Sequence, residues 1–140
     1  MSSIQHLVDA HAITTAQTVA VRGKVHRLPD ETAGLTAYVN FIYGSGGTTT
    51  KVYIQTTFDD KSTWMDIMSF AFTTSALKGV LSVREGTAIT TAVVPVDGAL
   101  AAGAVSGAIG KFVRAKIVTT GTYGGTTTVD VRLRIEHGNN

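Results

Sequence analysis

Residues 51–73, KVYIQTTFDDKSTWMDIMSFAFT, decide the fold that we expect for this chain. Apolar and polar side chains alternate over residues 51–58, and the pattern resumes over residues 64–72 after a polar run at 59–62. A period of two places one face of a strand against a core and the other in solvent. The stretch therefore predicts two strands joined by a polar turn, and no catalytic motif interrupts it.

Similar patterns predict strands along most of the chain. The predicted strands cover residues 17–26, 35–43, 77–85, 87–94, 111–120 and 129–135, and residues 4–13 are either a strand or an extended arm. Residues 35–43 are apolar on both faces, which favours a central strand. Short strands separated by Gly-rich turns are typical of a sandwich or a barrel. We expect an all-β, antiparallel, jelly-roll-like β-sandwich in a single domain, 1–140, with residues 1–16 as an extended N-terminal arm.

The strand at 129–135 has the most regular alternation. It predicts an inward face of apolar residues, Val129, Val131, Leu133 and Ile135. The outward face is charged and consists of Asp130, Arg132, Arg134 and Glu136. In the strand at 111–120, Arg114 and Lys116 are expected to point outward. If these two strands pair, the four cations Arg114, Lys116, Arg132 and Arg134 form one basic face, more typical of a salt-linked wet surface than of a nucleic-acid groove.

Length and composition exclude several classes of site. A chain of 140 residues is one domain by length. It contains no cysteine, which excludes disulfides, thiolate metal sites and cysteine nucleophiles. The start, MSSIQHLVDA, lacks the features of a signal peptide, and no apolar run approaches the ~18 residues of a membrane span. We therefore expect no membrane partner.

The low charge content points to an assembly. Only 16% of the residues are charged, against about 25% in an average soluble domain. Interface cores are depleted of charge, so we expect much of this surface to be covered by other subunits. The alternative is a threonine-rich β protein with no such partner. The net charge of +2 is small and unclustered, so we expect no nucleic-acid partner.

Residues 99–109, ALAAGAVSGAI, are expected to form a long loop, because three glycines at and just after this run disfavour a helix. Loops of this length are usually functional or cover another part of the domain. The candidate subunit-interface residues are Ala99, Leu100, Ala101, Ala104, Val105 and Ile109. A loop that packs on its own sandwich is the equal alternative.

No motif in the sequence indicates a metal or a reaction. The histidines (His6, His11, His26 and His137) lack metal-ligand spacing. Asp59, Asp60 and Asp66 surround Trp64, but an Asx-stabilised turn explains the first two better than calcium does. No nucleophile, base and orienting group can be named together. We expect no catalytic, cofactor or metal residues, and no enzyme activity.

A short sequence occurs twice. Residues 46–50 and residues 124–128 both read Gly-Gly-Thr-Thr-Thr, and each follows a nearby tyrosine, Tyr43 or Tyr123. Glycine pairs supply the positive φ of hairpin turns, and threonine favours the strand that follows. We interpret the two segments as the same turn chemistry used twice.

Two groups of motifs resemble a known family. The first is VYIQTT (52–57) with Asp59-Asp60, TWMDI (63–67) and FAF (70–72), and the second is KFVRAKI (111–117) with TGTY (120–123). Together they resemble small structural proteins of tailed-bacteriophage virions, over roughly residues 38–135. The resemblance implies a β-sandwich virion component, a capsid decoration (cement) protein that forms homo-oligomers, expected to be trimers, and binds the major capsid protein. It implies location in the virion, which is assembled in the host cytoplasm.

Two alternatives stay open. A tail, neck or fibre-associated subunit of the same kind of particle fits the resemblance as well. A carbohydrate-binding β-sandwich module is a different class, in which Trp64, Tyr38, Tyr43 and Tyr53 would supply a stacking platform.

Overall fold

A computed structural model of the chain describes residues 2–13 and 21–138. These residues form eleven strands and no helix. The strands are β1 (Ser2–Ala12), β2 (Val21–Arg27), β3 (Thr32–Ile42), β4 (Ser45–Gly46), β5 (Thr49–Thr57), β6 (Met65–Phe72), β7 (Leu77–Arg84), β8 (Gly103–Ala104), β9 (Phe112–Thr120), β10 (Tyr123–Gly124) and β11 (Thr128–His137). Over the described ranges, no helix has the length and apolar character that a membrane crossing requires.

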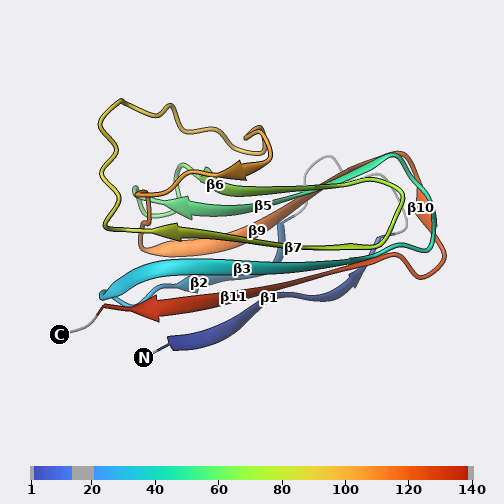
Figure 1. Cartoon of the computed structure of the whole chain (residues 1–140), viewed down its shortest axis with the longest axis horizontal. Helices are drawn as coiled ribbons and strands as arrows, with labels where there is room; N and C mark the ends of the chain where they lie inside the picture. Colours follow the sequence, from blue (N-terminus) through green and yellow to red (C-terminus); the bar gives the residue numbers. More distant parts are fainter. Residues whose placement is uncertain (1, 14–20, 139–140) are drawn as a thin grey trace.

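The strands build two main sheets. Sheet A has the order β1-β11-β3-β7, and sheet B has the order β2-β9-β5-β6-β8. A third, two-stranded sheet, β10-β4, lies at one end of the molecule (Figure 1). Every strand pair is antiparallel.

The strand order is that of a jelly roll. The eight long strands pair as β1 with β11, β2 with β9, β3 with β7, and β5 with β6. These are the pairs of one long antiparallel hairpin, and rolling that hairpin adds the pairs β11-β3 and β5-β9. The turn between β5 and β6 is the tip of the rolled hairpin. The predicted all-β, antiparallel, jelly-roll-like sandwich is confirmed, and β3 is a central strand as expected.

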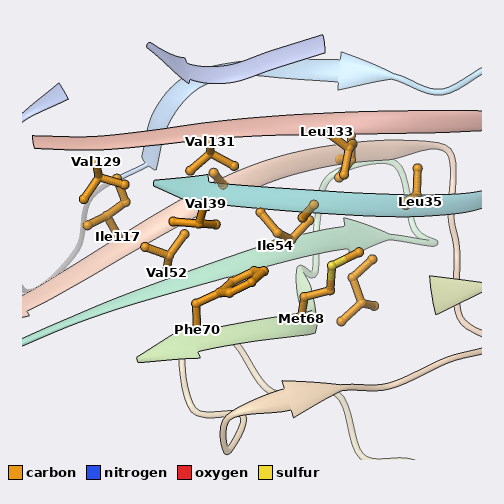
Figure 2. Close-up of a cluster of buried hydrophobic side chains, with 14 of the residues drawn as sticks. Leu35, Val39, Val52, Ile54, Met68, Phe70, Ile117, Val129, Val131 and Leu133 are labelled. Atoms are coloured by element: carbon orange, nitrogen blue, oxygen red, sulfur yellow. The ribbon is translucent and has the colours of Figure 1, made fainter. Parts of the chain in front are cut away.

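The core fills the space between the two sheets (Figure 2). Alternate residues of β3, β5, β9 and β11 point into it, and their side chains interdigitate with those of β6 across the sandwich. The figure labels Leu35, Val39, Val52, Ile54, Met68, Phe70, Ile117, Val129, Val131 and Leu133. The inward side chains of β11 are no more than 2% exposed, as the alternation predicted. The alternation over residues 51–58 predicts that Phe58 points inward with Val52 and Ile54, but Phe58 lies beyond the end of β5 and is 64% exposed.

One predicted strand is absent. Residues 87–94 lie in a long loop, residues 85–111, whose only strand is the two-residue β8. Their threonines and valines favour a strand only where a neighbouring strand is available to pair with. In the described chain residues 87–94 pair with no strand of either sheet.

The predicted basic face is also wrong. β9 lies in sheet B and β11 lies in sheet A, because the roll carries successive strands to opposite sheets. Arg114 and Lys116 are therefore on the outer side of one sheet, and Arg132 and Arg134 are on the outer side of the other.

At the N-terminus, the described part of the predicted arm is a strand. β1 pairs with β11 of the same chain. Of the two alternatives for residues 4–13, a strand or an extended arm, the structure therefore has the strand. The remainder of the arm, residues 14–16, and the first part of the strand predicted at 17–26 lie outside the described residues.

The two Gly-Gly-Thr-Thr-Thr segments meet in space. β4 pairs with β10, so that Gly46 lies opposite Tyr123. The Tyr123 ring lies against Gly47, where an added Cβ would be 2.4 Å from ring carbons. Its hydroxyl donates to the Thr73 carbonyl at 2.8 Å, and the ring meets Phe41 edge to face at 5.9 Å. The two turns thus form one unit that closes this end of the core.

Candidate functional site

The long loop covers the outer face of sheet B. As a result most of β5 and β6 is buried on both faces, except at Lys51 and Ala71, and the polar outer residues Gln55, Asp66 and Ser69 are at most 3% exposed. Buried polar groups need partners, since an unpaired one costs free energy. The contacts of these residues show how the loop is held.

Asp66 on β6 binds the loop backbone. Its carboxylate accepts hydrogen bonds from three consecutive amides, Gly98, Ala99 and Leu100, at 2.8–3.1 Å. Its own amide donates to the Val96 carbonyl at 2.8 Å. Successive N–H groups that converge on one anion form a nest, and Gly98 supplies the positive φ of 82° that this turn needs. One buried side chain therefore fixes residues 96–100.

A polar network extends from Asp66 across the sheet. The Gln55 amide donates to Asp66 at 2.7 Å and to Asp97 of the loop at 2.6 Å, and its carbonyl oxygen accepts from Arg114 at 2.8 Å. Lys116 donates to Asp97 at 2.9 Å. Both carboxylates and both cations thus have partners. We call these five residues, Gln55, Asp66, Asp97, Arg114 and Lys116, the loop network.

Asp97 is the exposed end of the loop network. Its side chain is 47% exposed, whereas those of Arg114 and Lys116 are 15% and 11% exposed. Burial alone would raise the pKa of Asp97, but hydrogen bonds from Lys116 and Gln55 and the charges of Lys116 and Arg114 outweigh it and lower the pKa. The carboxylate is therefore held ionised against two cations, a structural ion pair that fastens the loop.

Trp64 packs beside the loop network and outside the core between the sheets. The Arg114 guanidinium lies 4.1 Å from the centre of its ring, and the side chain is 8% exposed. This is a cation–π contact in a covered position. Tyr53 is also buried on this face; burial, and then the charge of Asp66, raise the pKa of its hydroxyl.

The four aromatic residues of the carbohydrate alternative do not form one platform. Trp64 and Tyr53 are buried on the outer side of sheet B. Tyr38 is half-buried on the outer side of sheet A, and Tyr43 packs against the core beside Tyr123. Arg114 occupies one face of the Trp64 ring, and the side chain is only 8% exposed, which leaves little of it for a sugar to stack on.

The six candidate interface residues have different surroundings. Ala99, Ala101 and Ala104 are exposed, and Leu100 is half-buried. Val105 and Ile109 pack against the core, and the Val105 amide donates to Ile67 at 2.8 Å. The loop therefore both packs on its own sandwich and presents small apolar side chains. Their role in an interface stays a prediction.

Sequence reasoning missed two features of this site. The most exposed large apolar side chain of the loop is Val94, at 79%, with Ile89 and Val93 near it in sequence, in the segment predicted as a strand. The alternation places Gln55 on the wet face of its strand and Asp66 in the strand at 64–72, and no local pattern indicates that a loop from residue 96 onward covers them.

The three aspartates around Trp64 do not converge. Asp59 accepts hydrogen bonds from the Thr63 amide at 2.7 Å and the Thr57 hydroxyl at 3.0 Å. The bond from Thr63 lowers the pKa of Asp59 most. The Asp59 carboxylate thus stabilises the predicted polar turn, but its backbone donor lies four residues on, not two as in an Asx turn. Among the residues that the structure describes, no cluster of histidine, aspartate and glutamate could hold a metal, and the side chains of His6 and His11 lie outside that description.

Comparisons with known proteins add little. No family model matches the chain, and no curated protein does. Among solved structures it is similar to a chain from Bacillus endospore appendages, described as a novel family of disulfide-linked pili, with 11% identity and a TM-score of 0.46. That match covers 99% of this chain and 92% of the other. The fold assignment rests on the strand order given above.

Proposed function

We propose that this chain is a non-enzymatic structural protein of a bacteriophage virion, a capsid decoration (cement) protein that binds the major capsid protein. In this proposal it oligomerises on the head shell, with a trimer as the expected form, and takes no cofactor. The motif resemblance suggests the family, and the jelly-roll order is one that viral capsid domains use. A fold hosts many functions, so the proposal depends on the surface of the molecule.

The observation that carries the proposal is the long loop. The loop network holds residues 96–100 in one conformation, and the neighbouring Ala99, Ala101 and Val94 are exposed. A contact segment that is already ordered loses less conformational entropy when it binds. Small apolar side chains also cost little to desolvate. The loop is thus suited to a stable contact between subunits.

Binding to an assembled shell stabilises that shell by mass action, because the bound state exists only in the assembled form. We expect the purified chain to be oligomeric, to co-sediment with capsids that lack it, and to raise their disassembly temperature. Val94→Asp should abolish co-sedimentation, because it places a charge in the apolar contact. Val25→Asp, at an exposed position of β2, should leave it unchanged.

Other outcomes would contradict the proposal. A monodisperse monomer with no affinity for capsids would exclude a cement protein. Hundreds of copies per virion, measured by mass spectrometry, support a shell location, whereas six or twelve copies would indicate a neck or tail subunit. Glycan binding that is lost in Trp64→Ala would favour the carbohydrate-binding alternative, which the position of Arg114 over Trp64 disfavours.

A further inference from the structure

We propose that β7 is a docking edge for a second copy of this chain, and that the two β7 strands pair antiparallel about a two-fold axis at Val80. The two copies of sheet A would then form one continuous sheet across the axis. The inference is independent of the proposed function, because it concerns one pair of chains, whatever particle they belong to. It applies equally to a free dimer and to the contact between two larger oligomers.

β7 pairs with another strand on one side only. It is the last strand of sheet A, and its neighbour there is β3 (Figure 1). The Arg84 amide donates to the Ser106 hydroxyl at 2.9 Å, so the backbone of Arg84 faces away from β3. The Glu85 amide donates to the Ala33 carbonyl at 2.9 Å, so the next residue faces toward β3. Even-numbered residues of β7 therefore direct their N–H and C=O groups out of the sheet.

Three of these residues have a free backbone edge. Lys78, Val80 and Ser82 have no hydrogen-bond partner for these outward groups among the residues that the structure describes. At Arg84, by contrast, the Ser106 hydroxyl binds both the amide and the carbonyl. The loop thus closes one end of the edge and leaves the rest open to another strand.

The open part has few of the usual protections of an edge strand. Natural edges are blocked by proline, by bulges, by charged side chains (above all lysine), by short length or by a covering loop, and of these the open part of β7 has only the exposed Lys78. β7 has eight residues and no proline, and its register with β3 is continuous from Gly34 to Phe41. Two large apolar side chains on it are mostly exposed, Leu77 at 56% and Val80 at 61%. Such an edge favours a partner that supplies both main-chain hydrogen bonds and apolar contact.

The sequence of β7 is complementary to itself. With the axis at Val80, the two Val80 side chains face each other, and Lys78 of each copy faces Ser82 of the other. No like charges are directly opposite, and the residues that face each other are those whose backbone groups point outward. Tyr38 is the partner of Val80 on β3, so its ring would continue the apolar row on both sides of the axis. These features favour a second copy over an unrelated strand.

Cysteine substitutions test the pairing directly, because the chain contains no cysteine of its own. Residues opposite each other in a hydrogen-bonded antiparallel pair have Cα atoms about 5.5 Å apart, within the range that a disulfide spans. Val80→Cys should therefore give a disulfide-linked dimer under mild oxidation. Ser82→Cys is the matched control, exposed on the same face of the same strand, but its two copies would be roughly 13 Å apart.

We expect Val80→Cys to cross-link at least about tenfold faster than Ser82→Cys at equal protein concentration. Equal rates, or no cross-link with Val80→Cys, would overturn the proposal. A second pair of variants avoids cysteine. Val80→Pro removes an amide that the monomer does not use, so circular dichroism should be unchanged while the dimer dissociation constant rises at least about tenfold. Val80→Thr keeps the amide and should keep the dimer, and a Val80→Pro protein that dimerises like the parent chain would refute the pairing.

Discussion

The outer faces of the two sheets carry similar sequence patterns and have opposite environments. On sheet A, the outward side chains of β11 include Arg132 and Arg134, which are exposed. On sheet B, the outward Tyr53 and Gln55 of β5 are buried, since the long loop covers them. An alternation of polar and apolar residues therefore identifies the inner face of a strand, but it does not show whether the outer face meets water or another part of the chain.

The difference also separates two kinds of surface. Sheet B is covered by its own loop, which the loop network fixes and which presents small apolar residues. Sheet A has no such cover over β7, and it ends in a strand with free backbone groups. We infer a preformed contact loop on one side of the sandwich and an edge for strand pairing on the other. Substitutions in the loop network should lower the free energy of unfolding because they release the loop from sheet B. They should leave the contacts of sheet A unchanged.

The largest effect is expected for Asp66→Ala. The substitution removes the acceptor of the amides of residues 98–100 and leaves Gln55 without one of its partners. Removal of one member of a buried charged network leaves its partners unsatisfied, so we expect a loss of about 4–5 kcal/mol in the free energy of unfolding. Denaturant unfolding measures this change.

Arg134→Ala on the outer face of sheet A is the control for Asp66→Ala. It removes an exposed charge, and we expect a change within about 0.5 kcal/mol. A similar small effect for Asp66→Ala would mean that the loop does not depend on this carboxylate.

Trp64→Ala should have the next largest effect. The side chain is covered by the Arg114 guanidinium, and its loss leaves a cavity under a charged group. We expect about 3 kcal/mol, at the lower end of the range for buried tryptophans, since Trp64 is outside the core between the sheets. The comparison is Tyr38→Ala, half-buried on sheet A, for which about 1 kcal/mol is expected. Equal losses would show that Trp64 is not buried against Arg114 in solution.

These contacts explain which features of the fold and of the site could be predicted from the sequence. The strand pattern predicted the sandwich and its core, since period-two alternation depends on neighbours within the same strand. It could not predict that Gln55 and Asp66 bind Asp97 and Gly98, because those contacts join a sheet to a loop that is distant in sequence. The pairing of Arg114 and Lys116 with Asp97 was missed for the same reason. The assignment of 87–94 as a strand failed because strand propensity carries no information about whether a partner strand is present.

The smallest effect is expected from protonation of Asp97, which probes the exposed end of the loop network. Burial alone would raise its pKa, but the hydrogen bonds from Lys116 and Gln55 and the charges of Lys116 and Arg114 lower it below the ordinary value of 3.8. The folded state therefore binds this proton less readily than the unfolded state does. The resulting stabilisation is fully present above the unfolded pKa and is lost as the pH falls through the folded pKa.

Asp97→Asn should remove that part of the pH dependence. Since Asp97 is half-exposed, solvent screens the pair, and we expect less than about 1 kcal/mol between the two proteins above pH ~4 and convergence of their stabilities toward pH ~2. Chemical denaturation from about pH 5 to about pH 2 measures the difference, and added salt should reduce it. Stability curves that stay parallel over this range would show that Asp97 is no better paired in the folded protein than in the unfolded chain, and that the amides bound by Asp66 hold the loop without it.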